Sequence, residues 1–317
     1  MTSFPRSGVG AAMITLFRDN GSIDAPAMAR LGGWLLSNGC DFLLLFGTTG
    51  EGPSLSAAER KDALRDMIAA GLSAERIVSG TGCAALSDTV MLTTAVGELG
   101  CAGALVVPPF FFRQATQAGL RDYLDQVLTG TRSAGTAIAL YHIPEVAGLG
   151  YDDHVIGSLI ADHPGRIQGI KDSTGDAVHA AGWAKRFSDV AVYAGDDHII
   201  RPVLAAGGAG PMTATAGLAP VLVAQVTAAA RRNPAAAPAQ EDRLSRLWLE
   251  VILAVPVTEA VKLIFAHVTG DPRWLRMRAP LRPLEPAVAE ATVARFQNLD
   301  DGSIAGAIKA MPTIFSP

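Results

Sequence analysis

The stretch Phe42-Leu-Leu-Leu-Phe-Gly-Thr-Thr-Gly-Glu51 joins an apolar run to a polar, glycine-containing turn, and Ser56-Ala-Ala-Glu59 follows shortly afterwards. The run has the length and composition of a strand that is buried on both faces. Ser56-Ala-Ala-Glu59 has the pattern of a capping box, which marks the start of a helix. The stretch therefore predicts one strand–turn–helix unit of an α/β protein.

Runs of the same kind recur along the first two thirds of the chain. The apolar runs are residues 9–16, 42–46, 76–81, 104–107, 137–141, 167–171, 190–194 and 208–215. The clearest helical segments between them are residues 24–38, 56–70, 87–99 and 116–128, with Ser87 or Asp88 as the expected start of the third. The first unit lacks the G-x-G-x-x-G turn of a dinucleotide-binding fold. Eight units predict a closed (β/α)8 TIM barrel.

The pattern changes after about residue 217, where strand signals become rare. Residues 221–232, 240–265 and 287–309 are predicted helices, with a loop at residues 233–238. Eight strand–helix units already account for the chain up to this point, so these helices are additional. We predict a catalytic barrel over residues 1–217 and a C-terminal helical extension, residues 218–317, that packs on the barrel.

Composition argues against several classes of protein. The chain has 317 residues, a net charge of −4 and a pI of about 5.9, so nothing predicts attraction to nucleic acid or to anionic membranes. No apolar window is long enough to predict a membrane span, and residues 1–6 lack the pattern of a secretory signal. Cys40, Cys83 and Cys101 show neither metal nor redox spacing. We expect a cytoplasmic protein with reduced thiols.

One lysine is placed at the end of an apolar run. The segment Arg166-Ile-Gln-Gly-Ile-Lys-Asp-Ser-Thr174 contains Lys171, whereas the other four lysines fall in segments with helical character. A buried ammonium is costly unless it is paired, and desolvation favours the neutral amine, which attacks carbonyl carbons. Lys171 therefore predicts a Schiff-base enzyme. The alternative is a buried ion pair with Asp172, Asp196 or Glu51.

Further candidates stand at the carboxyl ends of other strands, where barrel enzymes place their sites. Thr48 and Thr49 combine hydroxyls with backbone N–H groups at a turn, which suits a carboxylate, although they could serve the turn alone. Tyr141 is a candidate proton shuttle, the alternative being a tyrosine at the edge of the core. His142 is expected to point the opposite way and to be structural.

Strands seven and eight end in Gly195-Asp-Asp-His198 and Thr213-Ala-Thr215. The acidic pair and the histidine resemble a metal cluster, but consecutive residues do not easily converge on one ion, so we expect no metal. Hydrogen bonds to substrate hydroxyls, or helix capping, are favoured instead, which makes Asp197 and Thr213 candidates for substrate binding. An amine, a proton carrier and an anion-binding loop at neighbouring strand ends are what a 2-oxo acid requires.

These residues resemble the dihydrodipicolinate synthase / N-acetylneuraminate lyase family of lysine-dependent pyruvate lyases. The resemblance runs from about residue 9 to residue 284. Order and spacing agree for Gly47-Thr-Thr-Gly-Glu51, Gly80-Thr-Gly82, Tyr141-His-Ile-Pro144, Gly169-Ile-Lys-Asp172 and Gly195-Asp196. The resemblance implies a homotetramer, built as a dimer of dimers, that needs neither a metal nor an organic cofactor.

The resemblance also implies a role for each site residue. Lys171 would form an imine with C2 of pyruvate or another 2-oxo acid, and Tyr141 would shuttle protons at that carbon. Thr48 and Thr49 would hold the carboxylate, with Thr48 also touching the tyrosine hydroxyl. The backbone at Gly195 would help to shape the pocket.

Three departures concern the second substrate. Val146 stands where the synthases carry an arginine, and Phe110-Phe-Phe112 replaces a tyrosine pair of which one member reaches a neighbouring subunit's site. These changes remove a charged partner for a carboxylate and a part of the proton relay. Ala214 stands where the N-acetylneuraminate lyases are expected to carry a serine. With Leu149 nearby, the mouth is predicted to be apolar and to suit a smaller or less polar aldehyde, or a deoxy sugar acid.

The sequence therefore predicts a Schiff-base aldolase or dehydratase acting on pyruvate or on a 2-oxo acid such as a 2-keto-3-deoxy sugar acid. Cleavage and dehydration pass through the same imine and enamine, so both remain open. One alternative is a true dihydrodipicolinate synthase, which condenses pyruvate with aspartate semialdehyde. Another is a non-catalytic barrel that kept the pocket as a binding site.

Overall fold

Eight short parallel strands close into a barrel in which each strand pairs with its neighbours along the chain and β8 pairs with β1. The structure is a computed structural model and describes residues 2–235 and 240–315. The strands are β1 (Gly10–Ala12), β2 (Phe42–Leu45), β3 (Ile77–Gly80), β4 (Gly103–Val106), β5 (Ile138–His142), β6 (Ile167–Asp172), β7 (Ala191–Ala194) and β8 (Gly210–Thr213). This order confirms the predicted (β/α)8 barrel.

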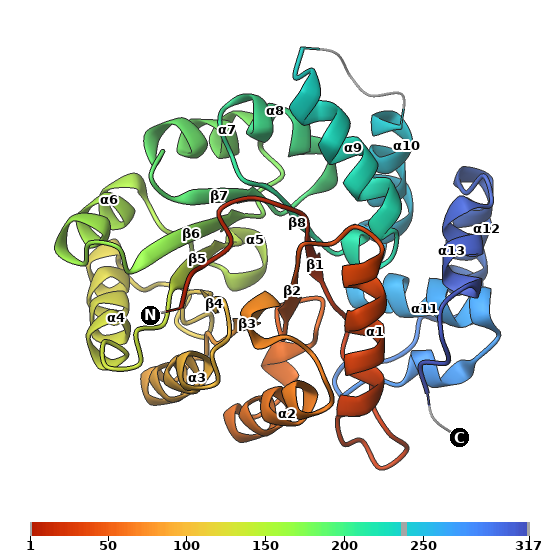
Figure 1. Cartoon of the computed structure of the whole chain (residues 1–317), viewed down its shortest axis with the longest axis horizontal. Coiled ribbons are helices and arrows are strands. Elements are labelled where there is room, and N and C mark those ends of the chain that lie inside the picture. Colours follow the sequence, from red (N-terminus) through yellow and green to blue (C-terminus); the bar gives the residue numbers. More distant parts are fainter. Residues whose placement is uncertain (1, 236–239, 316–317) are drawn as a thin grey trace.

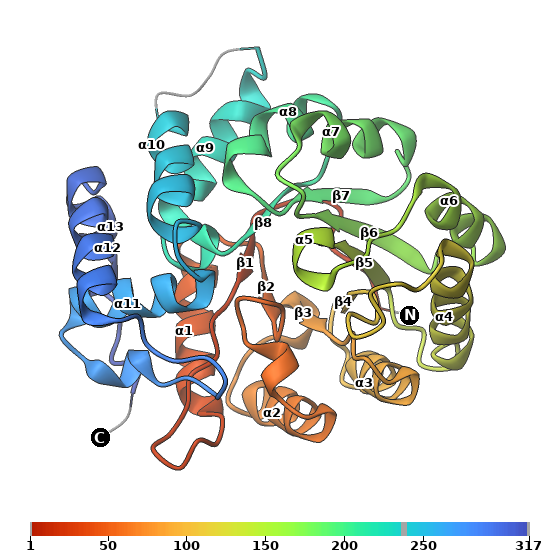
Figure 2. The same cartoon turned by 180° about the vertical axis from the view of Figure 1, so that it is seen from behind.

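Helices cover the outside of the barrel, and further helices from the C-terminal part of the chain lie outside this ring, beside α1 and α9 (Figures 1 and 2). The ring contains α1 (Ala25–Ser37), α2 (Ala57–Ala69), α3 (Leu86–Glu98), α4 (Gln117–Gly130), α6 (Asp153–Asp162), α7 (Ala177–Arg186), α8 (Ile200–Ala205) and α9 (Pro220–Arg232). The outer group contains α10 (Glu241–Arg246), α11 (Val257–Thr269), α12 (Pro286–Leu299) and α13 (Ser303–Lys309). The helices predicted in 240–265 and 287–309 are therefore present outside the ring, whereas 221–232, predicted as additional, is α9, the ring helix that follows β8.

Local signals explain how most ring helices begin. The capping box predicted for α2 is confirmed, because Ser56 Oγ accepts from the Glu59 N–H at 3.2 Å and Glu59 Oε2 accepts from the Ser56 N–H at 3.0 Å. The predicted start of α3 is wrong. The helix begins at Leu86 after Ala85, without a side-chain cap, and Ser87 and Asp88 lie inside its first turn.

Two helices predicted beyond residue 217 are interrupted. The segment 240–265 consists of α10, a π-helical turn over Leu247–Ile252 and α11, and the two arms are bent by 104°. Pro256 stands at the break, where its ring excludes a continuous helix. The segment 287–309 breaks between α12 and α13 at Gly302, which adopts a left-handed φ of 91°. The predicted loop 233–238 extends into residues 236–239, which lie outside the described residues.

The two bent arms, Glu241–Ile252 and Val257–Thr269, also matter for the question whether a helix of this chain could cross a membrane. In the described part of the chain, no single helix is long and apolar enough to cross a membrane, and the arms around Pro256 meet that criterion only together. Several of their apolar side chains, including Leu244, Trp248, Val251 and Phe265, are buried in the protein, whereas Leu249 is exposed.

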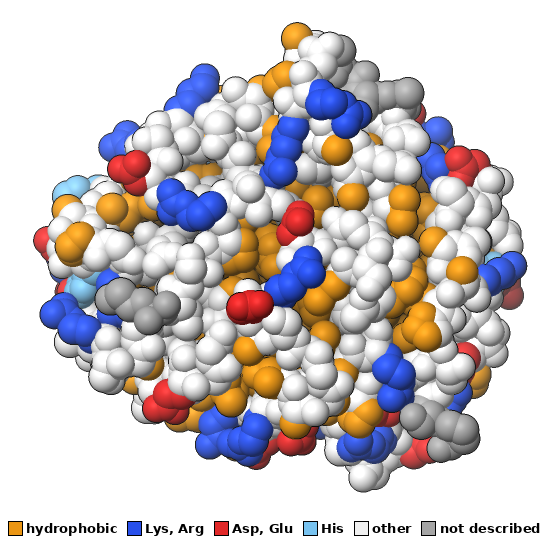
Figure 3. Space-filling model, viewed as in Figure 1, with side chains coloured by type: hydrophobic (Ala, Val, Ile, Leu, Met, Phe, Trp, Pro, Cys, Tyr) orange, Lys and Arg blue, Asp and Glu red, His pale blue; other side chains and the backbone are white. Residues whose placement is uncertain are grey.

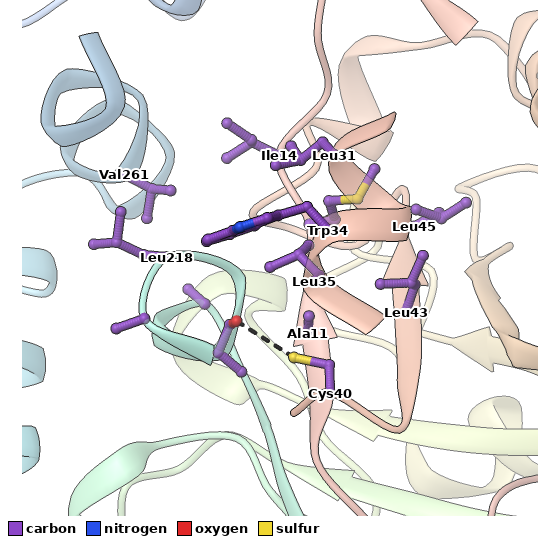
Figure 4. Close-up of a cluster of buried hydrophobic side chains, with 14 of the residues drawn as sticks. Ala11, Ile14, Leu31, Trp34, Leu35, Cys40, Leu43, Leu45, Leu218 and Val261 are labelled. Atoms are coloured by element: carbon purple, nitrogen blue, oxygen red, sulfur yellow. Dashed lines mark hydrogen bonds between the residues drawn. The ribbon is translucent and has the colours of Figure 1, made fainter. Parts of the chain in front are cut away.

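The barrel and the outer helices share one hydrophobic core. In Figure 4, Leu218 and Val261 lie to the left of Trp34 of α1, with Ile14 above the ring and Leu35 below it. Val261 belongs to α11, so this helix is anchored directly against the first barrel unit. The predicted division of the chain into a barrel and an extension at residue 217 stays a prediction. Residues from both sides of this boundary bury apolar side chains together.

The two ends of the barrel differ. At the amino end the N-terminal segment crosses the strands (Figure 1), and the buried ring of Phe4 packs edge-on against Tyr193 with centroids 6.1 Å apart. On the same face, charged side chains of both signs are scattered without a large patch of one sign (Figure 3). At the carboxyl end the short helix α5 (Pro144–Ala147) lies in front of the strands (Figure 2). The candidate residues gather at this second end.

Candidate active site

Lys171 and Tyr141 are direct neighbours on adjacent strands. Tyr141 of β5 is in register with Lys171 of β6, and the lysine Nζ lies 4.5 Å from the centroid of the tyrosine ring. Lys171 is only 5% exposed. A ring face stabilises a cation without neutralising it, so this contact keeps the amine at the barrel end without tying it to a carboxylate.

The three carboxylates weighed as ion-pair partners of Lys171 are engaged elsewhere or lie too far away. Asp172 accepts from Thr174 and bonds His179 Nδ1 at 2.6 Å. Glu51 pairs with Lys262. Asp196 makes no ion pair with Lys171 within 4 Å, although the lysine charge opposes the rise in pKa that burial causes at this carboxyl. Within residues 2–235 and 240–315, Lys171 has no salt-bridge partner, so the ion-pair alternative is wrong.

The threonine loop, residues 47–51, connects β2 to the first turn before α2. Thr48 Oγ1 lies 3.4 Å from the Tyr141 hydroxyl, a long hydrogen bond in which either atom could donate. Thr49 is buried, and its carbonyl accepts from Thr258 Oγ1 at 3.2 Å. Phe46 and Glu51 flank the loop with left-handed φ values of 55° and 56°. Such strained residues persist where the surroundings over-determine them, and they gather at functional sites.

A buried ion pair between Glu51 and Lys262 stabilises the threonine loop. Glu51 and Lys262 are both fully buried and hydrogen-bonded to each other, and Glu51 Oε2 also accepts from the Arg278 N–H at 2.9 Å. Lys262 Nζ donates to the Arg276 carbonyl at 2.6 Å. Burial lowers the pKa of Lys262, whereas the Glu51 charge raises it. The pair therefore fixes the position of the loop without contributing a reactive group.

A cavity of about 230 Å³ opens beside Tyr141 at the carboxyl end of the barrel. Thr48 and Tyr141 line it, together with apolar side chains and two arginines, while Lys171 is not among the described residues of its lining. The lining residues are Phe46, Gly47, Thr48, Pro53, Arg60, Gly80, Gly82, Leu105, Val107, Phe110, Arg113, Tyr141, Ile143, Val146 and Ala147. Of the residues predicted to form an apolar mouth, Phe110 and Val146 line the cavity, whereas Phe111, Phe112 and Leu149 do not, and the two arginines were not predicted.

The candidates on β7 and β8 are not among the described residues that line this cavity. Asp197 is 2% exposed, and its Oδ1 accepts from the Thr213 hydroxyl at 2.8 Å. Burial raises the pKa of Asp197 to about 7, and its Oδ2 has no hydrogen-bond partner among the described residues. The hydrogen bond from Thr213 occupies one oxygen of the Asp197 carboxylate. A substrate-binding role for these two residues stays a prediction.

Gly195 has a clear steric role. Its N–H donates to the Asp172 carbonyl at 2.6 Å, and a Cβ at this position would lie 1.9 Å from Ser173 Oγ. Only glycine therefore lets β7 end this close to the residues that follow Lys171. The expectation that Gly195 shapes the pocket is compatible with this packing and stays a prediction.

The two histidines singled out from the sequence point away from the cavity. His142 stacks on His179 with centroids 5.2 Å apart and meets Trp183 edge-on, so it faces α7 as its alternation with Tyr141 predicts. Burial lowers the pKa of His142 to about 4. His198 bonds the Gly175 carbonyl through Nε2 at 3.0 Å and does not converge with Asp197.

Sequence reasoning missed Arg60, Arg113, Thr258 and Lys262. For Lys262 a signal existed, because a lysine within the apolar segment of α11 is as unusual as Lys171 at the end of a strand. Arg60 gave no comparable signal, since a helix of charged and apolar residues accommodates an arginine anywhere on its outer face. The role of Lys262 depends on a contact across 211 positions of sequence, whereas Arg60 contacts residues 20 and 23 positions away in the next strand–loop unit.

Comparison with known proteins places these features in a family. The model of the dihydrodipicolinate synthetase family matches residues 5–298. A protein of Chloroflexus aurantiacus described as an uncharacterized DapA-like lyase is 33% identical over 297 residues, covering 93% of this chain and 98% of the relative.

Solved structures agree with this match. Dihydrodipicolinate synthase from Agrobacterium tumefaciens superimposes with a TM-score of 0.84 at 32% identity, covering 92% of this chain and 99% of the other. YagE, a prophage protein of the dihydrodipicolinic acid synthase family from E. coli K12 solved in complex with pyruvate, has a TM-score of 0.82 at 25% identity and covers 92% and 98%. This protein is therefore a Schiff-base lyase and belongs to the dihydrodipicolinate synthetase family.

Proposed function

We propose that Lys171 forms an imine with C2 of pyruvate or another 2-oxo acid, such as a 2-keto-3-deoxy sugar acid, and that the enzyme makes or breaks a bond at C3 or C4. The observation that carries this proposal is the contact between the unpaired Lys171 ammonium and the Tyr141 ring, beside the Thr48 hydroxyl. The pyruvate complex of the E. coli relative supports the choice of a 2-oxo acid.

Each step can be assigned to a residue. The Lys171 amine adds to the ketone carbon, and the resulting carbinolamine loses water to give a protonated imine. Tyr141 carries the proton to the departing hydroxyl, since its own hydroxyl is within reach of Thr48. Thr48 and Thr49 hold the carboxylate of the 2-oxo acid at the turn.

The imine then acts as an electron sink. Loss of a proton from C3 gives an enamine that attacks an aldehyde carbon. In the reverse direction a base removes the proton of the C4 hydroxyl, the C3–C4 bond breaks with its electrons passing to the imine nitrogen, and C4 leaves as the aldehyde carbon. If the group at C4 is a hydroxyl, the enamine can expel it as water once it is protonated. Hydrolysis of the final imine consumes one water and restores the amine.

Borohydride reduction in the presence of pyruvate tests the proposal. Reduction of the imine should fix the three-carbon unit on Lys171, located by mass spectrometry of a digest, and Lys171→Ala should abolish the adduct. Lys185→Ala is a matched control, because Lys185 lies at the outer end of α7. An unmodified wild-type protein after treatment with pyruvate and a panel of 2-oxo acids would sink the proposal.

A second candidate is 4-hydroxy-tetrahydrodipicolinate synthase, which the resemblance to the Agrobacterium tumefaciens enzyme favours. Val146 and Phe110 speak against it, because apolar side chains replace the arginine and the tyrosine expected of the synthases. Condensation of pyruvate with aspartate semialdehyde at a rate above that with all other aldehydes tested would establish the synthase activity and displace the first candidate.

We further propose a homotetramer, built as a dimer of dimers, in the cytoplasm. Phe111 is 76% exposed and Phe112 58% exposed at the rim of the mouth, and apolar side chains exposed to this degree favour a subunit contact. Cys40, Cys83 and Cys101 are free and buried, in keeping with a reducing compartment. The mass in solution, by light scattering, tests the assembly.

A further inference from the structure

Within the described part of the chain, Arg60 has no partner of opposite charge. Its side chain comes from α2 and is 4% exposed, yet it lines the cavity beside Tyr141. Nη1 donates to the Gly80 carbonyl at 3.4 Å, Nη2 points at Cys83 Sγ at 2.7 Å, and Nε has no partner. The carbonyl and the thiol are neutral, so neither supplies a negative charge to balance the guanidinium. Among the described residues, no carboxylate forms an ion pair with Arg60.

An unpaired guanidinium in this position is costly. Transfer of a charged group out of water carries a penalty of several kcal/mol unless a partner of opposite charge is present. The protein tolerates this cost at the wall of a cavity, where an anion from outside can supply the missing charge. The unpaired state of Arg60 therefore points to an anionic ligand.

Arg113 brings a second cation to the same cavity from the segment after β4. Its side chain lies against Gly148, where a Cβ would approach Arg113 Cδ to 2.7 Å, and it makes neither hydrogen bond nor ion pair within the described residues. Gly148 stands two residues after Val146. Arg113 thus brings a guanidinium to the region of Val146, the position at which the synthases carry an arginine. It does so from a different segment of the barrel rim.

The remaining wall limits what else can enter. The lining contains no aspartate or glutamate, and outside Thr48 and Tyr141 it is largely apolar, with Val107, Phe110 and Ile143 among its side chains. A neutral polyol chain would leave several hydroxyls without partners against such a wall, so among the 2-keto-3-deoxy sugar acids it favours those whose chain ends in an anionic group. A short chain that ends in an anionic group would satisfy both arginines and the apolar surface between them and Tyr141.

We propose that Arg60 and Arg113 bind an anionic group, a carboxylate or a phosphate, at the far end of the aldehyde that is condensed with or released from the 2-oxo acid. This rests on the proposed Schiff-base function and adds the class of the second reactant. The 2-oxo acid carboxylate occupies the threonine loop, and the two arginines select the aldehyde by its charge. Arg60 and Arg113 are thus specificity residues and take no part in bond making.

Aldehyde pairs matched in chain length test the proposal. With pyruvate present, kcat/KM is measured for butanal against succinate semialdehyde, and for glyceraldehyde against glyceraldehyde 3-phosphate. The wild type should favour at least one charged member by about 10- to 100-fold, the range expected for a charge-assisted hydrogen bond. The pair that shows the larger preference distinguishes a carboxylate site from a phosphate site.

Three variants separate the arginines from general effects. Arg113→Gln and Arg60→Lys should each lower kcat/KM for the charged aldehyde by about 10-fold or more and leave the neutral one unchanged. Arg65→Gln is the matched control, because Arg65 lies on the same helix but is exposed and pairs with Asp62. Arg113 is exposed, so its variant should fold even if the buried Arg60 variant does not. Equal rates for charged and neutral aldehydes, or equal losses for both, would overturn the proposal.

A binding measurement keeps this inference separate from the proposed chemistry. Succinate or inorganic phosphate, added without pyruvate, should raise the melting temperature of the wild type and not that of Arg113→Gln. Failure of pyruvate to modify Lys171 would refute the Schiff-base chemistry while this shift still reports the anion site. Absence of the shift with both anions, in a protein that pyruvate does modify, would refute the anion site alone.

Discussion

At the scale of single residues, Tyr141 is the group around which the others are arranged. Its ring contacts the Lys171 ammonium, its hydroxyl faces Thr48, and its edge lines the cavity. The strand register determines this, because Tyr141 and Lys171 are paired across β5 and β6. The structure thus brings together the amine and the proton carrier that the sequence predicted, and it places one of the two threonines within reach.

Replacement of Tyr141 by phenylalanine tests the role of its hydroxyl. Tyr141→Phe keeps the ring against Lys171 and removes only the oxygen near Thr48, so kcat should fall by about 10²- to 10⁴-fold, the usual contribution of general acid–base catalysis. Steady-state turnover gives the loss in rate, and borohydride trapping during long incubation should still modify Lys171. A turnover close to that of the wild type would show that another group moves the proton.

At the scale of elements, α11 connects the C-terminal part of the chain to the active site. Thr258 and Lys262 are four residues apart and so lie on one face of this helix. Thr258 donates to the Thr49 carbonyl and Lys262 pairs with Glu51. Val261, on a neighbouring face, packs beside Trp34 of α1. The packing of α11 among the outer helices therefore helps to determine where the threonine loop lies.

Removal of the lysine charge tests this connection. Lys262→Met leaves the Glu51 carboxylate buried without its counter-ion and should lower the free energy of unfolding by about 3–5 kcal/mol. It should also raise KM for pyruvate, since the displaced loop carries Thr48 and Thr49. Urea denaturation and steady-state kinetics measure the two effects.

The double variant Lys262→Met with Glu51→Gln is the control for the charge. A neutral amide keeps an acceptor for the Arg278 N–H and needs no counter-ion, so the double variant should be more stable than Lys262→Met alone. If the destabilisations of the two single changes simply add, the residues do not act as a pair, and the support of the loop by α11 must come from packing.

At the scale of the whole molecule, two buried groups give opposite dependences of stability on pH. Asp197 has its pKa raised from 3.8 to about 7, so its favourable contribution is complete below pH 3.8 and is lost as the pH rises to 7. His142 has its pKa lowered from 6.5 to about 4, so its contribution is complete above pH 6.5 and is lost as the pH falls to 4. Between about pH 4 and pH 6.5 the two groups therefore change the free energy of unfolding in opposite directions.

Single substitutions should reveal each slope. In Asp197→Asn the free energy of unfolding should rise more steeply with pH between 4 and 6.5 than in the wild type, because the opposing group is gone. In His142→Gln it should fall between pH 4 and 7 relative to the wild type. Urea denaturation at a series of pH values measures both. Parallel profiles for all three proteins would mean that neither group titrates as its burial implies.

Periodicity and composition were sufficient to predict the fold, because both depend on local properties. Apolar runs such as residues 42–46 are too short for helices and too apolar for exposed strands, so repetition of the unit leaves a barrel as the solution. The break at Pro256 was not predicted, since an apolar segment with one proline is compatible with a kinked helix as well as with two arms bent by 104°.

The sequence by itself determined the barrel, the strand end that carries Lys171, and the presence of Tyr141 and Thr48 on the same rim, because strand order fixes which carboxyl ends meet. Only the tertiary structure decided which charges are paired. It joins Glu51 to Lys262 across 211 positions of sequence and, among the described residues, leaves Arg60 without a carboxylate partner at the cavity wall. Pairing and burial depend on side chains that converge from distant segments, and no local pattern records that convergence.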